Sequence, residues 1–320
     1  MRMSGITLNV RGFAAAVALF AAIMAPRSHA APGPQQAGER GSAPGARQGG
    51  ADAGGRGGGR GAAAGPFVKA PGQLASGWNA ASTVARTKIR HEWVDIPGGA
   101  AKVHTWIEYP DGDAKAPVVL VMSYEAGVDE WIRSVADELA TSGFIGVAPD
   151  LLTGLGPNSG NYDSFKSPDE VIRAIRSKVV PAQAMRQYLA AAAYGARLPR
   201  ANGKIAAVGF GPGATFSFQF AAEAPTVDAA VVFYGPAPND AILQKVKVPM
   251  LGFYGEDDPD VTRTVAATAA AMKRYGKNFE YQIYPGATHH FGLIQIEGRN
   301  GPATQDAWNR TQAFLKERLQ

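Results

Sequence analysis

From about residue 66 onward, short apolar runs alternate with longer amphipathic segments. The run Pro-Val-Val-Leu-Val-Met over residues 117–122 is typical of a strand that is covered on both faces. Residues 128–141 instead carry apolar side chains at helical spacing, and Gly143 follows them as a stop signal. The same two patterns predict strands at 117–122, 144–148, 205–210, 229–234, 250–254 and 279–284, and helices at 128–141, 180–194, 213–224, 261–275 and 303–319. Residues 103–109 alternate between apolar and polar side chains and predict an exposed early strand.

Strands that alternate with helices predict an α/β domain with three layers, in which a mostly parallel sheet carries helices on both faces. We expect a loop over residues 151–168, where glycine and proline are frequent. Ligands of such sheets bind beyond the carboxyl ends of the strands. The residues that directly follow strands are therefore the first candidates for chemistry, and they lie at 123–125, 149–150, 211, 255–258 and 289–290.

The segment before this pattern divides into two parts. Residues 1–30 predict a signal peptide, because Arg2 and Arg11 accompany a short apolar run and Ser28-His29-Ala30 forms a small-x-small cleavage site. We therefore expect a periplasmic or secreted protein with no membrane attachment after cleavage. Residues 31–65 are rich in Gly, Ala and Arg and predict a disordered linker. Residues 66–320 then form one folded domain.

The net charge of +5 comes entirely from the N-terminal 65 residues, which hold seven Arg against two acidic residues. The remaining 25 basic and 25 acidic residues cancel, so the folded part gives no reason to expect nucleic-acid binding. An arginine–glycine nucleic-acid segment is the alternative interpretation of residues 31–65. The chain has no cysteine, which excludes disulfides, thiolate metal sites and a cysteine nucleophile.

A glycine-rich turn lies between a predicted strand and a predicted helix, where residues 209–214 read Gly-Phe-Gly-Pro-Gly-Ala. The spacing matches the dinucleotide motif G-x-G-x-x-A, but no acidic residue ends the following strand, where Tyr234 meets Gly235. It also matches the nucleophile elbow G-x-S-x-G, with Gly211 where the serine would stand. We favour a degenerate elbow over a dinucleotide site.

Two further signals follow the elbow in the chain. Asp258 follows the strand predicted at 250–254, and His289 and His290 follow the last strand. The order elbow, acid, histidine is that of the Ser–Asp–His hydrolases, in which the carboxylate orients the imidazole that acts as base. This order favours a catalytic pair of Asp258 and His289. The alternatives are a helix cap for Asp258 and a hydrogen-bonded loop histidine for His289. We expect His290 to be a neighbour of this pair in the pocket.

Taken together, these motifs resemble the dienelactone hydrolase family, the carboxymethylenebutenolidase-like proteins of the α/β-hydrolase fold. The resemblance covers most of residues 100–320 and rests on Tyr124-Glu125-Ala126-Gly127, Ala148-Pro149-Asp150-Leu151, residues 209–213, Gly255-Glu256-Asp257-Asp258, and residues 285–291. It implies a carboxylic ester or lactone hydrolase without cofactor or metal. By the same resemblance Asp258 and His289 correspond to the acid and the base, and Glu125 to the glutamate that contacts the nucleophile.

The chain departs from the family at the elbow itself. Gly211 has no nucleophilic side chain, and Pro212 has no N–H for the oxyanion hole. The sequence thus predicts an exported enzyme that acts on a small lactone, ester or carbonyl compound, with His289 or Glu125 activating water or moving a proton.

Two other interpretations remain open. One is an inactive pseudoenzyme that binds a small ligand or a protein partner. The other moves the nucleophile to Ser123, which we expect in the pocket with Tyr124, Pro212 and His290. The sequence predicts no oligomeric state.

Overall fold

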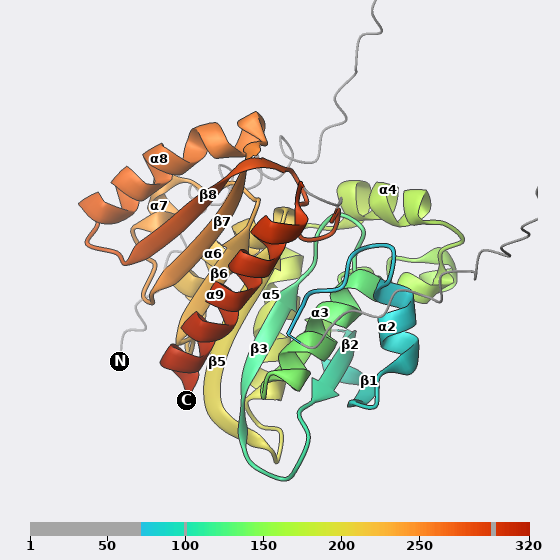
Figure 1. Ribbon diagram of the computed structural model, residues 1–320. Helices are drawn as coiled ribbons and strands as arrows, with labels where there is room; N and C mark the ends of the chain where they lie inside the picture. The colour runs from blue at the N-terminus through green and yellow to red at the C-terminus, as the bar shows by residue number, and fades with distance from the viewer. Residues whose placement is uncertain (1–71, 99–100, 296–298) are drawn as a thin grey trace, which may run out of the picture.

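The computed structural model describes residues 72–98, 101–295 and 299–320. The predicted signal peptide at 1–30 and the linker at 31–65 lie outside the described residues. No helix in these ranges is long and apolar enough to cross a membrane. The described residues form one eight-stranded sheet between two layers of helices (Figure 1).

The sheet has the strand order β1-β2-β4-β3-β5-β6-β7-β8. Its strands β1 and β2 run antiparallel to their neighbours, and all other pairs are parallel. The predicted α/β architecture with a mostly parallel sheet is therefore confirmed. The strands are β1 (Arg90–Pro97), β2 (Lys102–Tyr109), β3 (Ala116–Met122), β4 (Ile145–Pro149), β5 (Ala201–Phe210), β6 (Ala229–Phe233), β7 (Met250–Asp257) and β8 (Phe279–Thr288).

The helices divide between the two faces of the sheet, as Figure 1 shows for α9 and α3 in front and α5 and α6 behind. One face carries α2 (Ala80–Arg86), α3 (Glu130–Thr141) and α9 (Gly301–Leu319). The other carries α4 (Pro168–Lys178), α5 (Pro181–Gly195), α6 (Pro212–Glu223), α7 (Asp240–Leu243) and α8 (Pro259–Arg274).

The central strand β3 shows why two helix layers are needed. All seven of its residues are buried. Val119 and Val121 pack into the core shared with α3 and α9, whereas Val118 and Leu120 pack into the core shared with α5. Successive side chains of a strand point to opposite faces, so a continuous apolar run requires cover on both.

Four elements were missed by the sequence analysis, namely β1, α2, α4 and α7. The strand predicted at 103–109 is not exposed as expected, because β2 lies between β1 and β4 and most of its residues are buried. The alternation in β1 is weak because it is an edge strand whose side chains are mostly exposed or half-buried. The predicted loop at 151–168 contains two 3-10 turns, η2 (Pro157–Ser159) and η3 (Tyr162–Ser164), and α4 begins at its last residue. A start signal for α4 is present, since the Ser167 side chain accepts a hydrogen bond from the Glu170 N–H.

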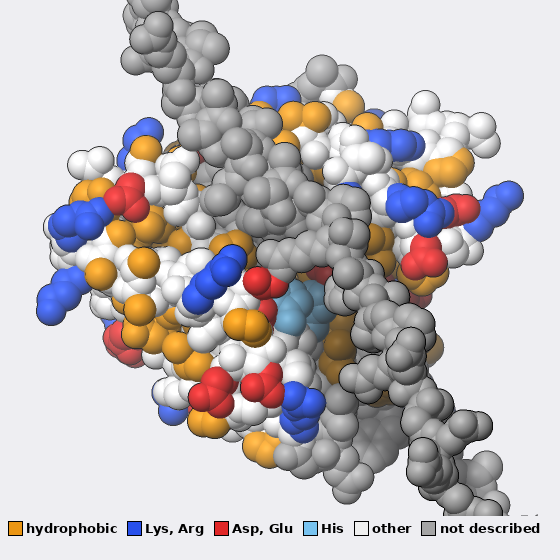
Figure 2. Space-filling model, turned by 90° about the horizontal axis from the view of Figure 1, so that it is seen from above, with side chains coloured by type: hydrophobic (Ala, Val, Ile, Leu, Met, Phe, Trp, Pro, Cys, Tyr) orange, Lys and Arg blue, Asp and Glu red, His pale blue; other side chains and the backbone are white. Residues whose placement is uncertain are grey.

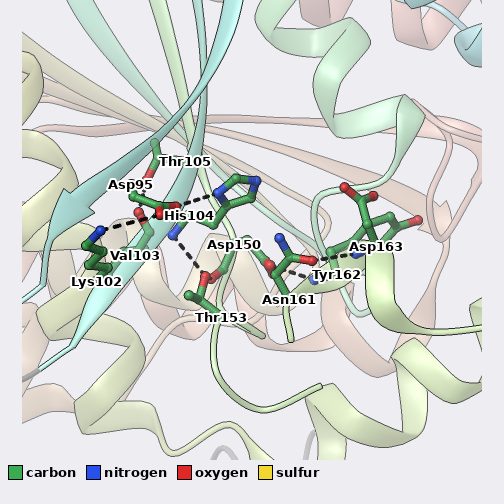
Figure 3. Close-up of polar contacts among 10 residues, drawn as sticks. All are labelled: Asp95, Lys102, Val103, His104, Thr105, Asp150, Thr153, Asn161, Tyr162 and Asp163. Atoms are coloured by element: carbon green, nitrogen blue, oxygen red, sulfur yellow. Dashed lines mark hydrogen bonds and ion pairs between the residues drawn. The ribbon is translucent and has the colours of Figure 1, made fainter. Parts of the chain in front are cut away.

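Asp150 holds the start of this loop at the carboxyl end of β4. The residue is 1% exposed, and its carboxylate accepts a hydrogen bond from the backbone N–H of Leu152 at 2.9 Å. It accepts a second from the backbone N–H of Tyr162 at 2.7 Å (Figure 3). Burial raises the pKa of Asp150 to about 6, although the two N–H donors oppose this. The buried carboxylate of Asp150 therefore holds the backbone of the loop in place at Leu152 and Tyr162.

We expect Asp150→Ala to lower the free energy of unfolding by about 2–4 kcal/mol, because it leaves two N–H groups near the protein interior without their acceptor. Urea denaturation monitored by circular dichroism measures this value. Asp163→Ala, at an exposed position of the same loop, is the matched control and should change stability by less than about 0.5 kcal/mol. Equal effects of the two substitutions would contradict the role given to Asp150.

Candidate active site

The predicted site residues come together where the parallel strands end. Figure 2 views the molecule from that side, and histidine side chains lie at the surface there beside an acidic side chain. Glu125 follows β3, Gly211 follows β5, and His289 and His290 follow β8. Asp258 stands between β7 and α8.

The turn from β5 to α6 is packed too closely for side chains at two of its glycines. A Cβ at Gly209 would lie 2.2 Å from the carbonyl oxygen of Gly213, and one at Gly213 would lie 2.1 Å from that of Met122. Real Cβ atoms do not approach so closely, so both positions require glycine. The close packing sets the start of α6 against the end of β3.

Gly211, between these two, has a different reason to be glycine. Its φ of 51° and ψ of −119° lie in a region that residues with a Cβ rarely adopt. The space beside it is open to a side chain, since the nearest atoms to a Cβ at this position would be Glu125 Oε2 at 3.5 Å, Tyr124 Cβ at 3.7 Å and His290 Nε2 at 3.8 Å. The strained turn expected for an elbow is present, and it could hold a side chain.

His289 and Asp258 form a hydrogen-bonded pair. His289 Nδ1 lies 2.5 Å from Asp258 Oδ2, and the Asp258 side chain is 7% exposed against 40% for His289. The bond assigns a proton to Nδ1 and leaves Nε2 of the neutral ring as a hydrogen-bond acceptor. The pair expected from the order of the residues is thus assembled, with its imidazole accessible to solvent.

His290 forms a second pair with a different carboxylate. Its Nε2 lies 3.2 Å from Glu125 Oε1, and both side chains are largely buried. The two imidazole rings are neighbours, with centroids 4.0 Å apart. The sequence analysis expected His290 only as a neighbour in the pocket. In the structure its Nε2 also contacts Glu125 and lies 3.8 Å from the position of a Cβ at Gly211.

Glu125 is ionised in this setting. Its burial would raise its pKa, but the close polar contact and the electrostatic interaction with His290 outweigh burial, so the pKa of Glu125 is lowered. A backbone N–H and the electrostatic interaction with His289 act in the same direction. The site therefore keeps a negative charge beside Gly211.

The segment that carries both histidines is fixed by residues that the sequence analysis missed. Asn300 is fully buried, accepts a hydrogen bond from Thr288 N–H at 3.2 Å and donates one to Thr288 Oγ1 at 2.9 Å. Thr304 donates a hydrogen bond to the carbonyl oxygen of Phe291 at 2.8 Å. Both residues come from the α9 region, and an isolated Asn or Thr gives no signal of such a role in the sequence.

The remaining residues predicted for the pocket differ in their surroundings. Tyr124 packs its ring against His290 and donates its hydroxyl hydrogen to Asp129 at 2.5 Å. Burial raises the pKa of Tyr124 well above its usual value. Pro212 is buried at the first position of α6, where its ring nitrogen has no hydrogen to donate. Ser123 is buried and interacts with Tyr188.

Tyr234, which directly follows β6, is a residue of the site that the sequence analysis did not predict. It is fully buried with a φ of 40°, and its ring contacts those of His289 and His290 at centroid distances of 5.6 Å and 5.4 Å. Its hydroxyl has no hydrogen-bond partner among the described residues. Burial, followed by the charges of Glu125 and Asp129, raises its pKa, so the hydroxyl stays neutral.

The arrangement supports proton transfer. Two imidazoles each lie beside a carboxylate, and an imidazole nitrogen can accept or donate a proton. No group of three or more potential metal ligands occurs within the described ranges.

Comparisons with known proteins identify relatives of most of the described domain. Residues 103–319 match the model of the Dienelactone hydrolase family. A protein of Saccharolobus solfataricus named "Putative carboxymethylenebutenolidase" is 30% identical over 228 residues, which are 62% of this chain and 88% of that protein. The namesake from Escherichia coli K12 is 26% identical over 212 residues, 63% of this chain and 77% of that protein.

Solved structures share the fold. Dienelactone hydrolase from Anabaena variabilis superposes with a TM-score of 0.56 at 20% identity, covering 73% of this chain and 100% of that one. The dienelactone hydrolase-like promiscuous phosphotriesterase P91, from metagenomic libraries, gives 0.60 at 22% identity, covering 72% and 99%. The chain therefore has the α/β-hydrolase fold. The roles given to Gly211, Asp258 and His289 stay predictions.

We expect Tyr234→Phe to raise the free energy of unfolding by about 1 kcal/mol, because it removes a buried hydroxyl that lacks a partner. Tyr284→Phe is the matched control, since the Tyr284 hydroxyl donates to Asp306 at 2.7 Å, and its loss should destabilise by about 1 kcal/mol. Thermal and urea unfolding measure both. A loss of stability in Tyr234→Phe would show that this hydroxyl is hydrogen-bonded in solution.

Proposed function

The chain belongs to the dienelactone hydrolase family, and from this premise we propose that it hydrolyses a small ester or lactone by base-assisted attack of water. The observation that carries the proposal is the pair formed by His289 and Asp258 beside an elbow turn that has no nucleophilic side chain. The pair is the part of a hydrolase site that activates a nucleophile, and water is the nucleophile that needs no side chain.

His289 is suited to the role of base. Its Nδ1 is bonded to Asp258, so the free Nε2 can accept a proton from water, and the carboxylate stabilises the imidazolium that forms. The ring is 40% exposed, which allows water to reach it. These features support a proton transfer from water to Nε2 as the first chemical step.

The elbow argues against an acyl-enzyme. In this proposal Gly211 stands at the nucleophile position, and its open surroundings show that packing alone does not forbid a side chain there. Pro212 cannot supply the next backbone N–H, and one such donor is worth about 3–4 kcal/mol of the barrier. Because both parts are missing, a covalent route has neither its nucleophile nor that oxyanion donor.

The substrate class follows from the relatives. Their name describes an enzyme that acts on a butenolide, which is a lactone, and we extend this to lactones and activated esters. We also propose that the domain is exported and acts in the periplasm or outside the cell, because residues 1–30 have the pattern of a signal peptide.

We expect the purified protein to hydrolyse 4-nitrophenyl acetate or dihydrocoumarin, and His289→Ala to lower kcat by about 10²–10⁴-fold by removing the base. Stopped-flow kinetics should show no burst of product equal to the protein concentration, and intact-mass measurement should show no acyl adduct. His91→Ala, at an exposed histidine of β1, is the control and should keep full activity. A protein that binds these compounds without turnover would instead be a ligand-binding pseudoenzyme.

The elbow generates a separate prediction. Gly211→Ser should lower the free energy of unfolding by about 1–3 kcal/mol, because of its positive φ, and should gain little acyl-enzyme activity. Gly211→Ser combined with Pro212→Ala restores the missing N–H and should exceed the serine variant by about 10²-fold in kcat. Labelling with a fluorophosphonate measures whether the new serine is nucleophilic. Pro212→Ala alone is the control and should not be labelled.

Full acyl-enzyme turnover by Gly211→Ser alone would contradict the role given to Pro212. An inert double variant that remains folded would contradict the elbow assignment.

A further inference from the structure

Carboxylates gather at the edge of the sheet where the parallel strands end. The described segments that directly follow the strands β3 to β8 are residues 123–129, 150–156, 211, 234–239, 258 and 289–295. They contain the acidic residues Glu125, Asp129, Asp150 and Asp258, and no lysine or arginine. Ligands of such sheets bind at this edge. The segments that would surround a ligand there therefore carry acidic side chains but no permanently charged basic one.

The arginines beyond these segments already have acidic partners. Three of them come soon after the segments along the chain, and each is paired: Arg133 with Glu130, Arg263 with Asp260, and Arg299 with Asp257. Arg299 also donates a hydrogen bond to the carbonyl oxygen of Gly286 at 3.1 Å. A carboxylate of a substrate would have to compete with the acidic side chain that is in place at each of these arginines.

Glu125 is the carboxylate that borders the place of the proposed reaction. Its Oε2 would lie 3.5 Å from a Cβ at Gly211, while its Oε1 lies 3.2 Å from His290 Nε2. The side chain is 19% exposed, so solvent screens its charge only in part. The lowered pKa of Glu125 keeps the carboxylate ionised. The open space beside Gly211 therefore has a negative charge at its border.

The other three carboxylates of this edge have partners of their own. Asp258 is bonded to His289, Asp129 accepts the hydroxyl hydrogen of Tyr124, and Asp150 accepts hydrogen bonds from two backbone N–H groups. Glu125 differs from them because one of its oxygens borders the space beside Gly211. It is therefore the residue that a charged group of a substrate would sense most strongly.

The sign of a substrate's charge decides whether Glu125 attracts or repels it. Two unit charges about 5 Å apart in a partly buried setting interact strongly enough to change an equilibrium constant by about tenfold or more. A carboxylate of a substrate is repelled, whereas an ammonium group is attracted. The negative oxygen that forms during ester hydrolysis is repelled as well, so we expect the carbonyl oxygen to point away from Glu125.

We propose that Glu125 sets the charge preference of the site, which selects esters and lactones with a cationic group over those that carry a carboxylate. The inference rests on the proposed hydrolysis and names the class of substrate that this reaction takes. The name of the relatives describes a butenolide with a carboxymethylene group. A carboxyl group of that kind is what the site of this chain disfavours.

The test uses three phenols of similar shape as inert ligands, namely 3-hydroxyphenyltrimethylammonium, 3-tert-butylphenol and 3-hydroxybenzoate. Isothermal titration calorimetry at low ionic strength should give a Kd for the cation at least about tenfold below that for the anion, with the neutral phenol between them. The three acetate esters of these phenols are the substrates. Their kcat/KM values, each divided by the rate of hydroxide-catalysed hydrolysis, should follow the same order, and added salt should narrow the differences.

Glu125→Gln removes the charge and keeps the shape of the side chain. It should bring the Kd values of the cation and the anion to within about threefold of each other. This ratio compares two ligands of one variant, so it is independent of any change in kcat. Asp163→Asn removes the same charge at an exposed position of the loop after β4, and as the matched control it should keep the wild-type ratio.

The outcomes separate the two proposals. A wild type that binds the anion as tightly as the cation, or a Glu125→Gln variant that keeps the wild-type preference, would refute the role of Glu125 and leave the hydrolysis of esters standing. A wild type that shows the binding preference but turns over none of the three acetates would refute the proposed hydrolysis and leave the charge preference in place.

Discussion

The close approach of the backbone between β3, β5 and α6 is the constraint on which the site depends. Because Gly209 and Gly213 leave no room for a Cβ, the start of α6 can contact the end of β3 directly. This contact brings the segment that carries Glu125 next to Gly211. A larger residue at either flanking glycine would separate these segments, and the charged groups would no longer share one space.

Two consecutive histidines can serve different carboxylates because the backbone changes direction between them. His290 has a φ of 58°, and its carbonyl oxygen accepts hydrogen bonds from the N–H groups of Leu293 and Ile294. Together with the buried Asn300, this turn sets the His289 ring toward Asp258 and the His290 ring toward Glu125. The strain of one left-handed residue is the cost of obtaining two separate pairs.

Much of this could be predicted from the sequence, for physical reasons that differ between elements. Continuous apolar runs predicted β3 and its parallel neighbours, because burial on both faces leaves no polar alternation. The partly exposed β1 gave no comparable signal. The pair of His289 and Asp258 followed from the ends of successive strands, whereas the contact of His290 with Glu125 depends on a local φ. The sequence contains the residues of that contact but not the direction of the turn.

The absence of a side chain at Gly211 and of an N–H at Pro212 has to be considered together. Glycine alone would leave a backbone donor for an oxyanion, and proline alone would leave a nucleophile. With both absent, the turn supplies neither a nucleophile nor the N–H donor of the residue that follows it. Of the three side-chain atoms nearest to a Gly211 Cβ, one belongs to a carboxylate and one to Tyr124, whose hydroxyl is bonded to Asp129. The third is His290 Nε2, which contacts that carboxylate, so the negative charge of Glu125 borders the space that a nucleophile would fill.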